Sequence, residues 1–149
     1  MEIAYSLNTL YFLLSGVLVM WMAAGFTMLE AGSVRSKNVI EILLKNVALY
    51  SVASLTFLIV GYSIMYGWGD IDTHSVYADF FFQVVFVATA MSVVSGAVAE
   101  RKKLWTFLLF AAIFTAIIYP IQGSWSWGGG WLSERGFFDF AGAGIVHMA

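Results

Sequence analysis

Long runs of apolar residues, separated by short polar segments, form the dominant pattern along the chain. Four of these runs extend from about residue 7 to 29, 46 to 66, 80 to 99 and 104 to 121. A helix that crosses roughly 30 Å of hydrocarbon needs about 20 apolar residues, since each residue adds about 1.5 Å to its length. The pattern therefore predicts four transmembrane helices, and a fifth apolar run opens near Phe137.

The continuity of the runs favours helices over the strands of a membrane barrel, in which apolar and polar residues alternate. The first run is longer than the apolar region of a signal peptide, and the only charged residue before it is Glu2. We expect it to be retained as a helix. The sequence thus predicts an all-α polytopic membrane protein with four full transmembrane helices and the start of a fifth.

The composition agrees with this prediction. Of the 149 residues, 61% are apolar and 11% are charged, whereas a soluble domain is about 25% charged. Seven basic residues against nine acidic ones do not supply the basic surface that binds nucleic acid. The absence of cysteine excludes a disulfide scaffold, a thiolate metal site and a cysteine nucleophile.

The charges are divided unequally between the two predicted sides of the membrane. One side holds six of the seven basic residues: Arg35, Lys37, Lys45, Arg101, Lys102 and Lys103. The other side holds most of the acidic residues: Glu2, Asp70, Asp72, Asp79, Glu134 and Asp139. Because short basic loops stay in the cytoplasm, we predict an inner (plasma) membrane protein with its N-terminus outside.

No sequence signature of a soluble enzyme is present, and we predict that the chain is not an enzyme. Walker A, GxGxxG, HExxH and GxSxG patterns are all absent. With two histidines and no cysteine, neither a metal nor a cofactor is expected. Asp70, Asp72 and His74 lie close together in one loop, but a hard cation needs more ligands and a solvated loop explains them.

The segment from Trp125 to His147 carries the most informative chemistry. It contains SWSWGGGW, which places indole rings around a glycine run, and then DFAGAGIVHM, which opens the fifth helix. Asp139 is suited to cap the first turn of that helix. His147 follows about 12 Å deeper, at 1.5 Å per residue. A buried imidazole at this depth is either functional or hydrogen-bonded to a neighbouring helix, and the sequence leaves both alternatives open.

A second group of candidate residues lies on the third predicted helix. Gln83 and Phe86 are one turn apart on the same face, and Phe86 is about 9 Å deeper than Phe80. The order of depth is then tryptophan, phenylalanine and imidazole. Such a column suits a small cation that sheds water, because aromatic faces replace part of its hydration. Ammonium also fits a neutral imidazole, since ammonium can release a proton and potassium and sodium cannot.

At these residues the sequence resembles the ammonium transporter (Amt/Mep/Rh) family, and in particular its bacterial Amt branch. Four motifs carry the resemblance in the right order and spacing: MLEAGSVRSKN, GAVAERKK, WGGGW and DFAGAGIVH. One departure is AGAGIVH, where many members have AGGTVVH. Trp127 matches a tryptophan of the family's ammonium recruitment site that Rh proteins generally lack, so it favours the Amt branch.

The resemblance implies roles for particular residues. Trp127 and Phe86 match the aromatic residues of the family's outer recruitment site and gate, and Gln83 falls one turn above that gate. Asp139 matches an acidic residue thought to be mainly structural, with help in proton handling. His147 matches the first of two pore-lining histidines.

The resemblance also implies an architecture and a function. Family members have about eleven spans built as two inverted five-helix repeats, so residues 1–149 are expected to be an N-terminal fragment that holds the first repeat. Ammonium would be recruited outside, deprotonated, and passed as ammonia along a histidine-lined pore by a homotrimer regulated by a cytoplasmic PII-type protein. The alternatives are an ammonium sensor with the same fold and a structural membrane subunit without a pore.

Overall fold

The computed structural model describes residues 2–69 and 71–149, and every regular element in these ranges is helical. The helices are α1 (Glu2–Ser33), α2 (Val39–Thr56), α3 (Tyr62–Met65), α4 (Val76–Ala97), α5 (Leu104–Ile113), α6 (Tyr119–Ser124), α7 (Trp131–Glu134) and α8 (Ala143–Met148). Short π-helical turns join α2 to α3 and α5 to α6, so the described residues contain four continuous apolar helices long enough to cross a membrane. The predicted all-α membrane fold is confirmed.

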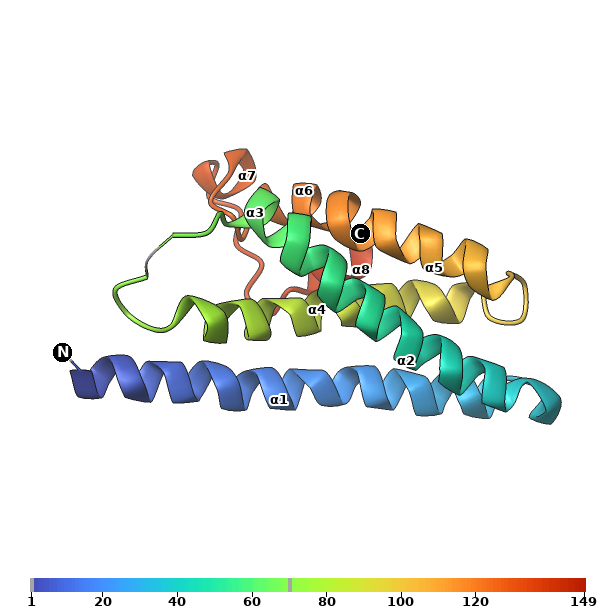
Figure 1. Ribbon diagram of the computed structural model, residues 1–149. Helices are drawn as coiled ribbons and strands as arrows, with labels where there is room; N and C mark the ends of the chain where they lie inside the picture. Colours follow the sequence, from blue (N-terminus) through green and yellow to red (C-terminus); the bar gives the residue numbers. More distant parts are fainter. Residues whose placement is uncertain (1, 70) are drawn as a thin grey trace.

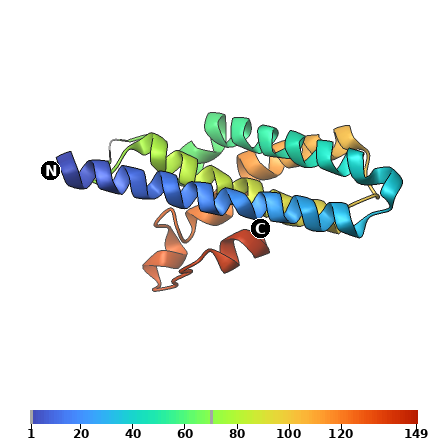
Figure 2. The same cartoon turned by 90° about the horizontal axis from the view of Figure 1, so that it is seen from below.

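The four long helices run back and forth along one another. As Figures 1 and 2 show, α1 and α4 run side by side in the same direction, and α2 and α5 return beside them. The connections at residues 34–38 and 98–103 therefore lie at one end of the bundle. The N-terminus, the loop before α4 and the short helix α7 lie at the other, and α8 packs back against α4 and α6.

Two π-helical turns, Phe57–Gly61 and Phe114–Ile118, pack against each other. Pro120 follows the second turn, and because proline has no N–H, the regular hydrogen-bond ladder cannot continue there. The hydroxyl groups of Thr56 and Thr115 join the two helices at 2.7 Å. Phe57, Phe114 and Thr115 of these turns are buried, whereas the intervening side chains such as Ile59 and Ile117 are exposed.

The fifth apolar run becomes helical at Ala143 rather than near Phe137. Gly136 and Gly142 have φ angles of +83° and +75°, and such left-handed residues interrupt a right-handed helix. Residues 137–142 therefore form an irregular segment that leads into α8.

Gly61 is required by the close approach of the two π-helical turns. A Cβ atom at this position would lie 2.8 Å from the Thr115 carbonyl oxygen and 2.9 Å from the Pro120 ring, and it would overlap the Phe57 ring. We expect Gly61→Ala to lower the free energy of unfolding by about 1–3 kcal/mol through overpacking. The measurement is the unfolding midpoint of the purified protein in detergent. Gly25→Ala is the matched control, because nothing lies within 4 Å of a Cβ at Gly25; equal effects of the two substitutions would contradict the packing argument.

Candidate functional site

Three aromatic rings meet beside the middle of α4. The rings of Phe86 and Trp127 are nearly perpendicular, at 76°, with their centroids 5.3 Å apart. Phe82 packs on the other side of Phe86 in the same edge-to-face manner at 5.1 Å. Phe86 is buried and Trp127 is half-buried, so the group offers ring faces both to the interior and to the outside. Two of these rings, Trp127 and Phe86, are the pair that the sequence singled out.

The indole of Trp127 is held by the irregular segment that precedes α8. Its Nε1–H donates a hydrogen bond to the backbone carbonyl of Asp139 at 3.0 Å. A Cβ atom at Gly142 would lie only 2.6 Å from the indole ring, so glycine is needed for the contact as well as for the φ angle. The Trp127 ring is therefore fixed by residues 139–142 and not by its own glycine-rich loop alone.

The carboxylate of Asp139 caps α8, as its position in the sequence predicts. Its Oδ2 accepts a hydrogen bond from the backbone N–H of Ile145 at 2.8 Å. The helix starts at Ala143, with Gly142 as the residue at its N-terminal cap, so the Asp139 side chain reaches the first turn from the preceding segment. Asp139 thus connects two parts of the site: its backbone carbonyl binds Trp127, and its carboxylate binds the first turn of α8.

Gln83 lies on α4 one turn from Phe86, but its amide faces the other way along the helix. Its Nε2 lies 3.4 Å from Oδ1 of Asp79, and the described residues offer it no hydrogen bond to Trp127. Gln83 is half-buried. Its polar partner is thus an acidic residue that the sequence did not single out.

His147 is exposed among the described residues, so this part of the chain does not itself cover the imidazole, and the pore-lining role stays a prediction. The predicted depth assumed a continuous helix from Asp139, whereas residues 139–142 are not helical. On the same helix, Ile145 and Val146 are buried against the core. The imidazole therefore lies on the face of α8 that these 149 residues leave uncovered.

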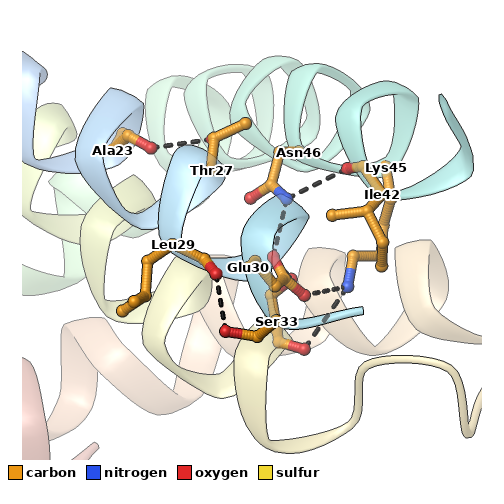
Figure 3. A network of polar contacts seen from close by, with 9 residues as sticks. Ala23, Thr27, Leu29, Glu30, Ser33, Ile42, Lys45 and Asn46 are labelled. Carbon is orange, nitrogen blue, oxygen red and sulfur yellow. Dashed lines mark hydrogen bonds and ion pairs between the residues drawn. The ribbon is translucent and has the colours of Figure 1, made fainter. Parts of the chain in front are cut away.

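A buried polar network that the sequence pattern does not predict lies near the connection between α1 and α2. The pattern places Lys45 in a cytoplasmic loop, but it is buried within α2 and pairs with Glu30 of α1 (Figure 3). Asn46 donates to Glu30 at 2.7 Å, and the hydroxyl of Ser95 on α4 donates to the same carboxylate at 3.0 Å. The error arose because the helices extend beyond their apolar runs, and a paired charge can lie inside a helical bundle.

The two connections at this end are joined by Glu100. Its carboxylate accepts hydrogen bonds from the Asn38 side chain at 2.6 Å and from the Arg35 backbone and guanidinium at 3.0 and 3.2 Å. These bonds, with that from Asn38 first, hold the pKa of Glu100 below its ordinary value because they favour the ionised form. Asp70, one of the acidic loop residues noted in the sequence, lies outside the described residues.

The Glu30–Lys45 pair permits a clear test of stability. We expect Lys45→Met to lower the free energy of unfolding by about 3–5 kcal/mol, because it leaves a buried carboxylate without its cation. The double substitution Glu30→Gln with Lys45→Met removes both charges and keeps an acceptor for Asn46 and Ser95, so it should recover much of that loss. Unfolding midpoints in detergent measure both. A single substitution that costs no more than the double one would contradict the pairing.

The four long apolar helices define the chain as an all-α polytopic membrane protein. Residues 10–149 match the Ammonium Transporter Family, and the chain belongs to this family. It is 43% identical over 159 residues to ammonium transporter Amt2 of Archaeoglobus fulgidus, covering 91% of this chain and 34% of that protein. It is 35% identical over 159 residues to ammonium transporter 3 of Dictyostelium discoideum, covering 99% and 37%.

A solved structure titled Sensor Amt Protein has the same fold. It matches 99% of this chain and 42% of its own chain, with a TM-score of 0.89 and 38% sequence identity. The chain thus spans about a third of the length of the curated relatives it matches. These relatives are named as transporters rather than as enzymes.

Proposed function

We propose that residues 1–149 form the N-terminal part of a transporter that moves ammonium across the membrane. In this proposal the outer ring cluster recruits ammonium, the cation loses its proton near Phe86, and ammonia continues past His147. Family membership supports the transport of ammonium. The edge-to-face contact of Phe86 and Trp127 supports the steps of recruitment and deprotonation, because it joins a half-buried ring to a buried one.

The rings supply what a cation needs at this point. An aromatic face attracts a cation by about 0.5–2 kcal/mol, so two rings replace part of the hydration that the cation loses. Asp139 keeps the indole in place through its carbonyl. The buried side of Phe86 is apolar and favours the uncharged species, so a cation reaches it at a much higher cost than ammonia does.

His147 is assigned to the pore because of where α8 presents it. Its imidazole lies on the uncovered face of a helix whose other face is packed on α4. In a protein of the relatives' length, further chain is available to form the opposite wall of a passage along that face. A neutral imidazole there both donates and accepts a hydrogen bond, which suits ammonia.

The remaining assignments follow the same proposal. The basic connections at residues 34–38 and 98–103 lie at one end of the bundle, which supports a cytoplasmic placement there and an N-terminus outside the inner membrane. A homotrimer and a PII-type cytoplasmic partner belong to the proposal through the family resemblance. The two curated relatives above are named as transporters and the solved neighbour is titled Sensor Amt Protein, so transport is the proposal and sensing is the alternative.

Replacing Trp127 tests recruitment. We expect Trp127→Leu in the full-length protein to raise the apparent KM for methylammonium uptake by several-fold and to weaken discrimination in favour of ammonium, since a cation–ring attraction is lost. Trp105→Leu is the control, because it makes the same change at an indole on α5 that is 82% exposed. An unchanged concentration dependence and selectivity in Trp127→Leu would refute the recruitment role.

Replacing His147 tests the pore. His147→Ala and His147→Asp should each change the rate or the selectivity of methylammonium uptake, because one removes the imidazole and the other puts a charge in its place. Met148→Ala serves as the control, since Met148 is the neighbouring exposed side chain on α8. If conduction and selectivity survive both histidine substitutions, His147 does not line the pore, and a structural role remains.

A further inference from the structure

One face of α4 carries an acidic residue in line with the outer ring cluster. Asp79, Phe82, Gln83 and Phe86 follow one another at spacings of three or four residues, which places them on the same side of the helix. Asp79 lies in the first turn of α4, about 10 Å from Phe86 along the axis. The amide of Gln83 lies between them and contacts the Asp79 carboxylate at 3.4 Å.

The carboxylate of Asp79 is buried, and its close partners are neutral. The residue is only 8% exposed. The phenol of Tyr62 on α3 donates to Oδ2 at 2.6 Å, and Gln83 approaches Oδ1. These contacts fix the orientation of the carboxylate without adding a positive charge.

No lysine or arginine in residues 2–69 and 71–149 lies within ion-pair distance of Asp79. The nearby group that comes closest to being a basic partner is the imidazole of His74, whose Nε2 lies 3.8 Å from Oδ1 of Asp79. That imidazole is stacked on Phe12 at 4.0 Å, and its Nδ1 pairs with the Thr73 hydroxyl at 2.8 Å. Glu30, the other acidic side chain that is buried among the described residues, differs because it is paired with Lys45.

A chain of ring contacts joins this acidic corner to the ring cluster. Phe12, which stacks on His74, packs edge-to-face on Phe82 at 5.3 Å, and Phe82 packs on Phe86. Aromatic side chains thus occupy much of the space around the line from Asp79 to the site. Because rings exclude water, a charge at Asp79 is screened less along this line than it would be in solution.

We propose that Asp79 is the counter-charge of the outer ammonium site and raises its affinity for a cation through space. This inference rests on the proposed function. Asp79 does not touch the cation; Tyr62 and Gln83 hold its carboxylate, which acts on a charge held by Phe86 and Trp127. At about 10 Å and an effective dielectric constant of about 20, one unit charge changes the affinity for a monovalent cation by roughly tenfold. The carboxylate exerts no such attraction on neutral ammonia, so it favours ammonium at the first step.

The test is methylammonium uptake by the full-length protein at low ionic strength and in an alkaline medium that keeps imidazole groups neutral. We expect Asp79→Asn to raise the apparent KM by about tenfold with the maximal rate within about twofold. Asparagine keeps the volume and an acceptor for the Tyr62 phenol, so the change isolates the charge. Asp79→Glu restores the charge and should recover most of the affinity. Asp72→Asn, at an exposed loop position, makes the same charge change and should leave KM within about twofold.

Each outcome separates this inference from the proposed function. If Asp79→Asn leaves KM unchanged while Trp127→Leu raises it, the counter-charge is wrong and recruitment at the rings stands. If Asp79→Asn lowers the maximal rate with KM unchanged, or if Asp79→Glu fails to recover KM, the residue acts structurally and the inference is overturned. If neither Trp127 nor His147 affects transport, the proposed site itself fails, whatever Asp79 does.

Discussion

A charge inside a membrane bundle is costly unless other groups pair with it or hydrogen-bond to it, and this constraint sets the contact between Glu30 and Lys45. The pair joins α1 to α2, and through the Ser95 hydroxyl it also fixes α4. A bilayer offers these groups no water, so separating the helices here would expose an ionised side chain to hydrocarbon. The position of α4 along α1 and α2 is therefore set at this end.

At the other end, α4 is held by a second set of polar contacts. The loop that leads into it is tied to α1, because Asn8 donates to the Thr73 carbonyl at 3.0 Å and Thr9 accepts from the Ser75 backbone at 3.0 Å. Phe86 lies between these two anchored ends. The irregular segment before α8 then brings Trp127 to it through the Asp139 carbonyl. The site thus combines a rigid helix with a loop that only glycine at position 142 permits.

The sequence predicts well whatever depends on long apolar runs. The four helices, the pairing of Trp127 with Phe86 and the capping by Asp139 all follow from hydrophobicity, resemblance and helix-end chemistry. It fails where contacts between distant residues determine the structure. Local charge places Lys45 in a loop, but Lys45 is buried because Glu30 of α1 pairs with it. The late start of α8 depends on φ at Gly142, which hydrophobicity does not reveal. The one-turn spacing between Phe82 and Phe86 could have identified Phe82 as a site residue. The burial of Asp79 could not be predicted in this way, because it depends on the packing of α3.

The π-helical turn between α2 and α3 has a consequence for the direction of the side chains beyond it. A π turn holds one residue more than an α turn, so every side chain that follows is rotated by roughly 100° about the axis compared with an uninterrupted α-helix. Tyr62 is the first residue after this turn, and its phenol meets Asp79. In an uninterrupted α-helix the phenol would point elsewhere, so the surplus residue at 57–61 aims the hydroxyl group that steadies the carboxylate.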